Sequence, residues 1–386
     1  MSLFFNETHK TLRDTVRRFA ETEIAPTAAE LDENQGFNLS AMKKMGEMGL
    51  LGITADADFG GSGMDAVSAT LVMEELGAVC ASTALSYLAH SILAVNNLSH
   101  NGSEKQKAKY LPKLCSGEWI GSMAISEPAA GSDAYGLKLS AVKKGDKYLL
   151  NGTKMWITNG PYSDFFWVYA KTGPSKKDIS TFIVEKSFKG FSVGKKLNKL
   201  GMRASPTSEL IFENCEVPIE NLVGEEGKSI AHMAKNLLIE RITIAGISLG
   251  ISRATISYCT KYAQDRKQFD TRLIDFQMVS KMLADATAEY LAARSLTYEA
   301  AASLDRNEKS ELSLMLGSSA KLFAAHRATK IAMDGIQILG GYGYTKEYPV
   351  ERFMRDAKLN EIGAGTNEVM RVILGRELDK GNFPGV

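Results

Sequence analysis

The chain has 386 residues, of which 44% are hydrophobic and 24% charged, and its formal net charge is +1. A chain of this length exceeds the usual limit for a single hydrophobic core, so we expect two or three domains. The near-neutral charge gives no indication of the basic surface typical of a nucleic-acid-binding protein or of an acidic tail.

The first part of the chain has the pattern of helices. Apolar residues recur at helical spacing over residues 8–24, and Ser40 lies where the N-cap of a second helix is expected. Residues 66–94 are almost wholly apolar and predict a buried element, and a short helix follows over residues 103–112. These patterns predict an all-helical domain over residues 1–118.

The hydrophobic pattern changes after Trp119. Short β-branched or aromatic runs, separated by Gly, Asn, Asp and Pro, lie at residues 148–150, 165–169, 181–184 and 209–213. They predict a small antiparallel β domain over residues 119–228. Long helical patterns return from Ser229 and predict a third domain over residues 229–386, with helices at about 230–265, 275–305, 309–340 and 366–378. Helices, strands and helices in this order indicate the α+β class.

The N-terminus and the cysteines predict the compartment. Met1 opens directly into an amphipathic pattern, without the charged and apolar regions of a signal peptide. No apolar run reaches the roughly 20 residues that a membrane-spanning helix needs. The four cysteines lack metal-site or CxxC spacing, which indicates free thiols in a reducing compartment. We expect a bacterial cytoplasmic or mitochondrial-matrix protein with no metal site, no membrane span and no nucleic-acid partner.

Two stretches of the β segment have the composition of a ligand site. The first combines an apolar strand with a glycine-containing turn, Met123-Ala-Ile-Ser-Glu-Pro-Ala-Ala-Gly-Ser-Asp133, and the second is Lys154-Met-Trp-Ile-Thr-Asn-Gly160. They supply hydroxyl groups, a bare backbone and a flat aromatic face against which a planar cofactor could stack. Ordinary turn chemistry explains their Ser-Asp and Asn-Gly pairs equally well.

A third candidate is the loop near the end of the chain, Gly363-Ala364-Gly365. Thr366 follows it at an expected N-cap, before a helix with an apolar face. A bare loop that ends in a helix N-terminus can approach a ligand closely and direct N–H groups toward it. A glycine hinge between two helices is the alternative for this loop taken alone.

The two β-segment motifs, in this order, resemble the signature of acyl-CoA dehydrogenases, and the resemblance covers essentially the whole chain. It implies an N-terminal helical domain, a central small antiparallel β-barrel domain and a C-terminal four-helix bundle. It also implies an FAD cofactor, an acyl-CoA substrate, an electron-transferring flavoprotein as electron acceptor, and a homotetramer.

The resemblance implies two groups of FAD-binding residues. The flavin group consists of Met123, Ile125, Ser126, Gly131, Ser132, Trp156, Ile157 and Thr158, with Thr158 near flavin N5 and Trp156 covering the ring. The adenosine group would contact the FAD diphosphate and adenosine across a subunit interface, and consists of Arg266, Phe269, Phe276, Gln277, Gln337, Ile338, Gly340 and Gly341. Thr366 and Glu368 are also implied. A solvated helix charge at Arg266 and a helix stop at Gly340-Gly341 are the alternatives.

The reaction of this family needs a base, because it removes a proton from the α carbon while hydride leaves the β carbon. A carboxylate in a dry site is suited to this, since desolvation makes it more basic. In most of the family a Glu immediately precedes Gly-Thr, but here that position is Ala364. Glu240 replaces it as candidate, because it shares a largely apolar helix stripe with Met233, Leu237, Ile244 and Ile247. A surface pair of Glu240 with Arg241 is the alternative, although Arg241 lies roughly 100° around the helix.

The base position and the loop together resemble isovaleryl-CoA dehydrogenases in particular. Gly363 and Ala364 leave room for a methyl branch, and the resemblance implies that the Ala364 N–H polarises the thioester carbonyl. It implies that Arg241 meets a CoA phosphate and that the pantetheine passes Ser132. The substrate-binding residues implied are Ser132, Leu237, Arg241, Gly363, Ala364, Gly365 and Arg371. One departure is Leu238, which stands where relatives usually have Asp.

The expected function is FAD-dependent α,β-dehydrogenation of a short branched acyl-CoA, with isovaleryl-CoA favoured, as in leucine catabolism. Three alternatives remain open. The first is a dehydrogenase for long-chain or other acyl-CoAs. The second is an acyl-CoA oxidase or flavin monooxygenase that uses dioxygen. The third is a non-catalytic scaffold of the same fold.

Overall fold

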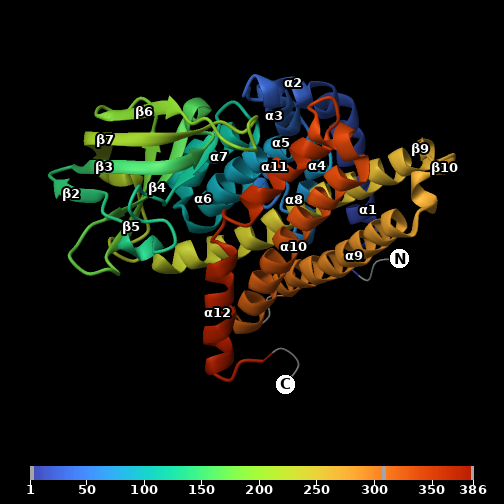
Figure 1. The fold of residues 1–386 in the computed structure, drawn as a ribbon. Helices are drawn as coiled ribbons and strands as arrows, with labels where there is room; N and C mark the ends of the chain where they lie inside the picture. Colours follow the sequence, from blue (N-terminus) through green and yellow to red (C-terminus); the bar gives the residue numbers. More distant parts are fainter. Residues whose placement is uncertain (1–3, 307–309, 384–386) are drawn as a thin grey trace.

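The structure is a computed structural model that describes residues 4–306 and 310–383. A β domain lies at one end, long C-terminal helices extend to the other end, and the N-terminal helices pack between them (Figure 1). The predicted α+β architecture of helical, β and helical parts is confirmed.

The N-terminal helices are α1 (Glu7–Phe19), α2 (Ala28–Glu33), α3 (Leu39–Glu47), α4 (Ala66–Gly77), α5 (Ala81–Tyr87), α6 (Asn96–Asn101) and α7 (Glu104–Cys115). Two π-helical turns, Ala20–Ile24 and Leu88–Val95, extend α1 and α5. The cap predicted at Ser40 was wrong, because the N-cap is Asn38, whose side chain accepts from the N–H of Ala41, the third residue of α3, at 3.0 Å. The apolar stretch predicted at residues 66–94 is not one continuous helix, because Cys80 takes an extended conformation after α4.

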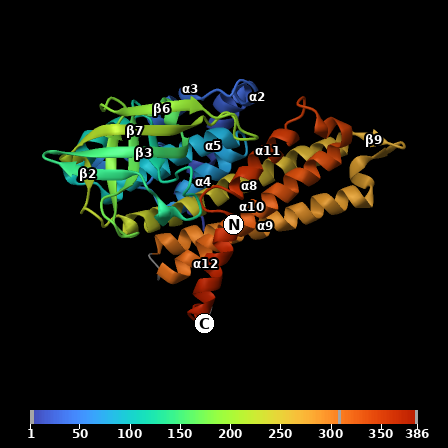
Figure 2. The ribbon, with the colours of Figure 1, turned by 60° about the vertical axis from the view of Figure 1, so that its left-hand side comes forward.

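The β domain contains β1 (Gly121–Ala124), β2 (Ser140–Lys144), β3 (Lys147–Thr158), β4 (Phe165–Lys171), β5 (Ile179–Glu185), β6 (Phe191–Lys196), β7 (Thr207–Pro218) and β8 (Leu222–Val223). In the described chain they form an eight-stranded sheet in the order β6-β7-β3-β2-β4-β5-β8, with β1 beside β4. Most pairs are antiparallel as expected, but β1 and β2 both pair with β4 in parallel. Figure 2 shows this sheet at one side of the molecule, beside the helices.

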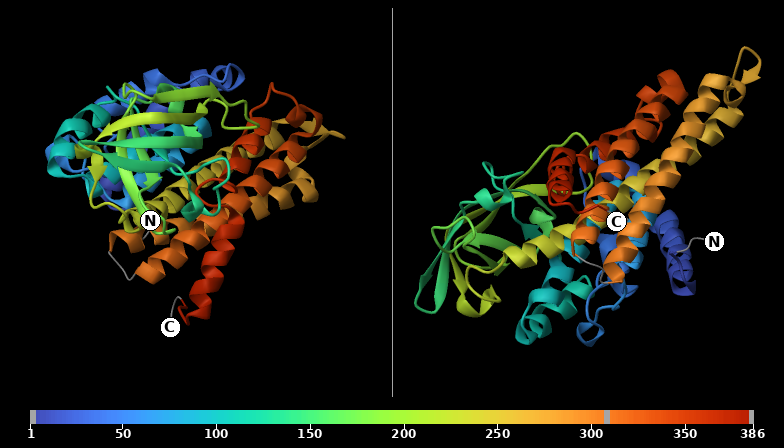
Figure 3. Two further views of the ribbon diagram at one scale, coloured as in Figure 1. Left: turned by 90° about the vertical axis from the view of Figure 1, so that its left-hand side faces the viewer. Right: turned by 90° about the horizontal axis from the view of Figure 1, so that it is seen from below.

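The C-terminal part is built on the long helices α8 (Ile230–Asp265), α9 (Gln277–Asp305) and α10 (Ser310–Leu339). Two shorter helices, α11 (Val350–Asn360) and α12 (Asn367–Asp379), follow the three long ones in the described residues, and α12 lies where the last helix was predicted. The short strands β9 (Lys267–Gln268) and β10 (Thr271–Arg272) form a hairpin at the far tip (Figure 1). Figure 3 shows α12 projecting away from the body of the chain.

Helix α8 is long and apolar enough to cross a membrane, judged by length and composition alone. However, 72% of its most apolar window is buried inside the protein. It is therefore a core helix, and the four cysteines are buried free thiols as predicted.

His90 joins the helices to the β domain. Its Nδ1 accepts a hydrogen bond from Gly121 N at 2.9 Å, and its Nε2 donates to the Leu114 carbonyl at 3.0 Å. Burial lowers the pKa of His90 from its ordinary 6.5 to about 4. The neutral imidazole is therefore part of the fold, and its contribution to stability is full above pH 6.5 and is lost as pH falls toward 4.

We expect the free energy of unfolding to fall by about 2 kcal/mol between pH 7 and pH 5 because of this histidine. Chemical denaturation of the wild type and of His90→Gln at both pH values measures that part as the difference between their pH dependences. His326→Gln is the matched control, because its side chain is 56% exposed. An identical pH dependence in wild type and His90→Gln would contradict the assignment.

Candidate active site

Glu240 lies in the first third of α8 and is only 7% exposed. Among the described residues, no side chain or backbone N–H pairs with its carboxylate. Burial raises the pKa of Glu240 from 4.5 to about 7, although the positive charges of Arg241 and Lys321 oppose the rise. The carboxyl group is thus poised to gain or lose a proton near neutral pH.

The Gly363-Ala364-Gly365 loop packs on α8 one turn from Glu240. A Cβ atom added to Gly363 would lie 3.7 Å from Cδ1 of Ile244, which is four residues after Glu240 on the same helix face. Hydrogen bonds from Gly363 N to the Leu359 carbonyl and from Asn367 N to the Glu361 carbonyl fix the two ends of the loop. The loop and the carboxylate therefore share one site.

The loop presents backbone rather than side chains. Ala364 and Gly365 have φ values of 57° and 83°, and the Thr366 side chain caps α12 by accepting from Val369 N at 3.2 Å. The predicted N-cap is confirmed. Within the part of the chain that the structure describes, the Ala364 N–H has no acceptor. It is free to donate to a ligand, although an alanine at positive φ is strained.

Arg241 offers a positive charge beside this site. It is 8% exposed, and its Nε has no hydrogen-bond partner in the described ranges. Burial lowers the pKa of Arg241, and it interacts electrostatically with Tyr135, which follows the turn that contains Ser132. A buried guanidinium with an unused donor fits an anionic group of a ligand.

The two β-segment motifs lie side by side and are joined by a backbone hydrogen bond and by a buried lysine side chain. Ser126 accepts a hydrogen bond from Met155 N at 2.9 Å through its carbonyl. The buried Lys154 ammonium donates to the Ile125 carbonyl at 2.7 Å and to Glu127 Oε1 at 3.0 Å. Neither Lys154 nor Glu127 was predicted. A lysine between the apolar positions of a strand was the available signal.

Trp156 presents a flat face at the edge of this pair. It is 60% exposed with φ 65°, and the register of β3 against β7 shifts between Lys154 and Ile157. A β-bulge there turns the indole outward. A Cβ added to Gly131 would meet nothing within 4 Å. An exposed aromatic face beside a hydroxyl and an open glycine fits a planar cofactor with a polar edge.

Other members of the predicted flavin and substrate sets differ in exposure. Ile125 and Ile157 are buried, so only their backbone can face a ligand, while Met123 and Leu237 are half-buried. Glu368 and Arg371 are exposed on α12 and form an ion pair at 3.0 Å. These two residues lie on the first turns of a helix that begins at the loop.

The adenosine group lies around the β9–β10 hairpin at the tip of the long helices (Figures 1 and 2). The flavin group lies where the β domain meets the helices, since the Met123 sulfur contacts Asn97 and Asn236. The Arg266 guanidinium lies 5.5 Å from the centre of the Tyr342 ring, and Phe269 is 91% exposed. A Cβ at Gly340 or Gly341 would meet nothing within 4 Å. The remaining members lie at two helix ends. Phe276 and Gln277 are where α9 begins, and Gln337 and the buried Ile338 are near the end of α10.

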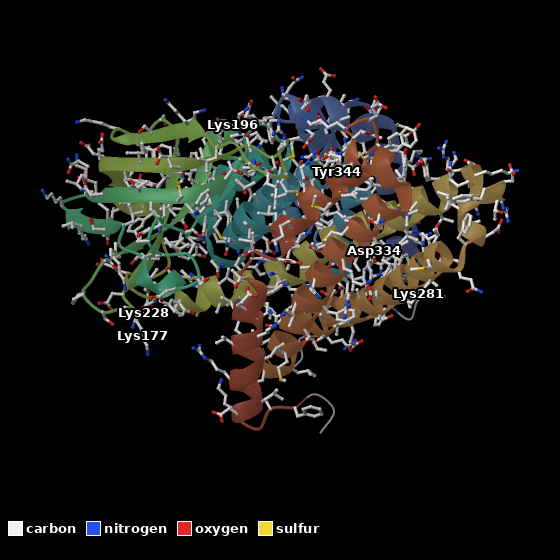
Figure 4. The ribbon with its side chains drawn as sticks, in the orientation of Figure 1. Lys177, Lys196, Lys228, Lys281, Asp334 and Tyr344 are labelled. Atoms are coloured by element: carbon white, nitrogen blue, oxygen red, sulfur yellow. The ribbon has the colours of Figure 1, made fainter. Side chains whose placement is uncertain are left out.

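Figure 4 labels residues on the two sides of the molecule. Lys177 and Lys228 mark the β-domain side, whereas Lys281 and Asp334 mark the side of α9 and α10. One chain therefore does not bring the flavin and adenosine groups together.

The chain matches three parts of one family along nearly its whole length. Residues 6–118 match the acyl-CoA dehydrogenase N-terminal domain, residues 122–215 the middle domain and residues 227–378 the C-terminal domain. Mitochondrial isovaleryl-CoA dehydrogenase of Bos taurus is 47% identical over 96% of this chain and 88% of that protein. Short-chain-specific acyl-CoA dehydrogenase of Clostridium acetobutylicum is 43% identical over 95% of this chain and 97% of that protein.

Solved structures agree in fold. Butyryl-CoA dehydrogenase from Megasphaera elsdenii has a TM-score of 0.94 and 36% identity, over 98% of this chain and 100% of that one. A chain from a study of the electron transferring flavoprotein of Acidaminococcus fermentans has a TM-score of 0.95 and 39% identity, over 98% of this chain and 99% of that chain.

Proposed function

The chain belongs to the acyl-CoA dehydrogenase family of FAD-dependent oxidoreductases, and from this premise we propose that it dehydrogenates a short branched acyl-CoA, with isovaleryl-CoA as preferred substrate. The observation that carries the proposal is the buried, unpaired carboxylate of Glu240 beside a loop without bulky side chains. Glu240 is the base, and Gly363-Ala364-Gly365 is the wall of the acyl site.

The residues of the chain act on the proton and on the thioester. FAD, when bound, supplies the acceptor for the hydride that leaves the β carbon. The Ala364 N–H donates to the thioester carbonyl oxygen and so acidifies the α proton. Glu240 removes that proton, and its pKa of about 7 keeps it ionised for a large part of the time at neutral pH. Arg241 binds an anionic group of CoA with its free Nε.

The placement of the two cofactor groups supports an oligomer. In this proposal the flavin lies on Trp156, Thr158 and the Ser126–Ser132 turn of one subunit. The adenosine group of a partner subunit completes the site, because within one chain this group lies at the β9–β10 tip, away from the flavin group at the junction of the β domain and the helices. A homotetramer satisfies this arrangement for every subunit.

The branched substrate follows from the loop and is consistent with the bovine relative named above. A side chain longer than a methyl group at Gly363 would enter the space between the loop and Ile244. The electron acceptor that we propose is an electron-transferring flavoprotein. The location that we propose is the bacterial cytoplasm or the mitochondrial matrix, since one relative named above is a mitochondrial protein and the other is from a bacterium.

The test is anaerobic bleaching of the flavin by isovaleryl, isobutyryl, 2-methylbutyryl, butyryl and palmitoyl thioesters of CoA. We expect isovaleryl-CoA to give the highest kcat/KM, by roughly tenfold over butyryl-CoA, which is the usual effect of one fitted methyl group. A preference for butyryl-CoA or palmitoyl-CoA would overturn the branched assignment. Rapid reoxidation in air of the protein reduced by substrate would point to an oxidase instead.

Gly363→Ala sharpens this test. The added Cβ fits without a clash, so the variant should fold and keep butyryl-CoA turnover while its preference for isovaleryl-CoA falls. Gly375→Ala on α12 is the matched control, because its added Cβ meets nothing within 4 Å and its position is exposed. An unchanged preference for isovaleryl-CoA in Gly363→Ala would mean that the methyl branch of the acyl group does not lie beside Gly363.

A further inference from the structure

Asp356 is a buried carboxylate on α11 that binds a loop of the β domain. It is only 2% exposed, and its Oδ1 accepts a hydrogen bond from the backbone N–H of Met202. No cation of the described residues lies within ion-pair distance of it. A buried carboxylate without a counter-cation is costly for folding unless its contacts compensate. Met202 belongs to the loop of residues 197–206, which joins β6 to β7, so this contact ties the β domain to α11.

The loop of residues 197–206 also meets α11 backbone to backbone. A Cβ added to Gly201 would overlap the Arg355 carbonyl oxygen and lie 2.7 Å from Asp356 N. Any larger residue would therefore have to push the loop and α11 apart. The Arg355 guanidinium donates to the Leu200 carbonyl at 3.3 Å. The contact with α11 is thus close-packed along several residues of the loop.

The N-terminal helices hold the same loop from a second side. The Arg203 Nε donates to the Asp32 carbonyl at 3.0 Å, and the Asp32 carboxylate pairs with Arg355 at 2.8 Å. The Ser205 hydroxyl forms a hydrogen bond of 2.9 Å with the hydroxyl of Ser86 on α5. The loop is therefore fixed to the N-terminal and C-terminal helices as well as to its own sheet.

The base of the loop joins the strand that carries Thr158. Leu197 N donates to the Thr207 carbonyl at 2.8 Å, which closes the loop. Thr207 is the register partner of Thr158 at the end of β3, and Asn159 N donates to the Pro206 carbonyl at 2.8 Å. In the proposed function Thr158 lies beside the flavin. The loop therefore transmits the position of the flavin strand to α11.

Helix α11 carries the other half of the site. It ends at Asn360, and the Gly363-Ala364-Gly365 loop follows after two residues. Asn360 Nδ2 donates to Ser248 Oγ at 2.9 Å, so the end of α11 is fixed to α8, the helix of Glu240. One turn earlier, Asp356 fixes α11 to the β domain. Helix α11 thus connects the flavin strand with the loop that we assign to the thioester.

We propose that Asp356 is a positioning residue that sets the distance between the flavin strand and the Gly363-Ala364-Gly365 loop. This role rests on the proposed function, because it assumes a flavin at Thr158 and a thioester at Ala364. The transfer of a hydride needs reacting atoms at contact distance, and a misplacement of about 1 Å can lower a rate by roughly 100-fold. Asp356 acts through the Met202 N–H rather than on either ligand.

The test is the rate of flavin reduction at saturating acyl-CoA, measured anaerobically by stopped flow with the thioester that bleaches the wild type fastest. Asp356→Ala removes the acceptor and should lower this rate by about 10–100-fold. The FAD content and the dissociation constant of the acyl-CoA should stay close to the wild-type values, because no ligand contact is lost. A wild-type rate would overturn the proposal, as would a lower rate explained by loss of FAD or of substrate affinity.

Two conservative variants separate position from charge. Asp356→Asn keeps an acceptor oxygen in the same place and should keep the wild-type rate. Asp356→Glu keeps the carboxylate but lengthens the side chain by one methylene group, so the rate should fall although the charge is unchanged. This variant also decides the question if Asp356→Ala does not fold. A wild-type rate in Asp356→Glu, or a loss in Asp356→Asn as large as in Asp356→Ala, would contradict the positioning role.

Gln106→Ala is the matched control. The Gln106 side chain is buried, and its amide donates from α7 to the Glu220 and Leu222 carbonyls of the β domain at 2.8 and 2.9 Å. The variant therefore loses a domain contact of the same kind at β8 and the turn before it, rather than at Thr158. It should lower stability without changing the rate of flavin reduction. A loss of rate equal to that of Asp356→Ala would overturn the specific role of Asp356.

A measurement without substrate separates this proposal from the proposed function. Amide hydrogen exchange of residues 361–366 should be faster in Asp356→Ala than in the wild type or in Gln106→Ala, because α11 loses a fixed support. Faster exchange in a protein that no acyl-CoA bleaches would sink the proposed function and leave the link through α11 intact. Bleaching of the wild type, with exchange and rate unchanged in Asp356→Ala, would do the reverse.

Discussion

Glu240→Gln should bind FAD but lose bleaching by the preferred acyl-CoA, with a rate lower by about 10²–10⁴-fold, which is the usual effect of removing a positioned base. Glutamine keeps the volume of the side chain and cannot accept the α proton. In the wild type the same rate should fall about tenfold per pH unit below pH 7, since only the ionised carboxylate reacts. Anaerobic stopped-flow absorbance measures both. Bleaching by Glu240→Gln near the wild-type rate would remove Glu240 from its role.

The same substitution should stabilise the fold. The pKa of Glu240 is raised to about 7 in the folded state, so the folded protein disfavours the charge that the unfolded chain carries above pH 4.5. Stability from this group is present below pH 4.5 and lost as pH rises to 7, a loss of about 3 kcal/mol by pH 8. Glu240→Gln should recover most of this free energy of unfolding at pH 8 and none of it at pH 4. Glu311→Gln, at an exposed position, should leave the free energy of unfolding unchanged at both pH values.

Features of this site that depend on local pattern were predictable from the sequence. The apolar stripe around Glu240 follows from helical spacing, and the cap at Thr366 follows from residue type and position. The bulge that exposes Trp156 was not predictable, since it depends on the pairing of β3 with β7. The parallel pairing of β1 with β4 likewise depends on contacts between distant segments.

The charged groups behind the site were missed for the same reason. Lys154 meets Glu127, and Lys321 meets Asn367, across 27 and 46 residues of sequence respectively. Neither lysine shows in the sequence which partner it meets. Only the packing of helix on helix or strand on turn buries it and makes its partner significant.

Lys154→Met should destabilise the protein by about 3–5 kcal/mol, the usual effect of removing one partner from a buried ion pair. The Lys154 ammonium is fully buried and holds both Glu127 and the Ile125 carbonyl. Glu127 would retain only the backbone N–H groups of Lys138 and Leu139. Because Ile125 and Glu127 flank Ser126, the Ser126–Ser132 turn, where we propose that the flavin binds, should also become less ordered. Denaturation midpoints and the FAD content of purified protein measure these effects.

A double variant separates the unpaired charge from the lost contact. Glu127→Gln with Lys154→Met leaves no buried charge, so it should recover a large part of the stability that Lys154→Met loses. The matched control is Lys147→Met on the same strand, where the lysine pairs with Glu216 at 2.6 Å but both side chains are over 30% exposed. That change should alter stability by less than about 1 kcal/mol. A double variant as unstable as Lys154→Met would mean that packing, rather than the charge on Glu127, holds the turn.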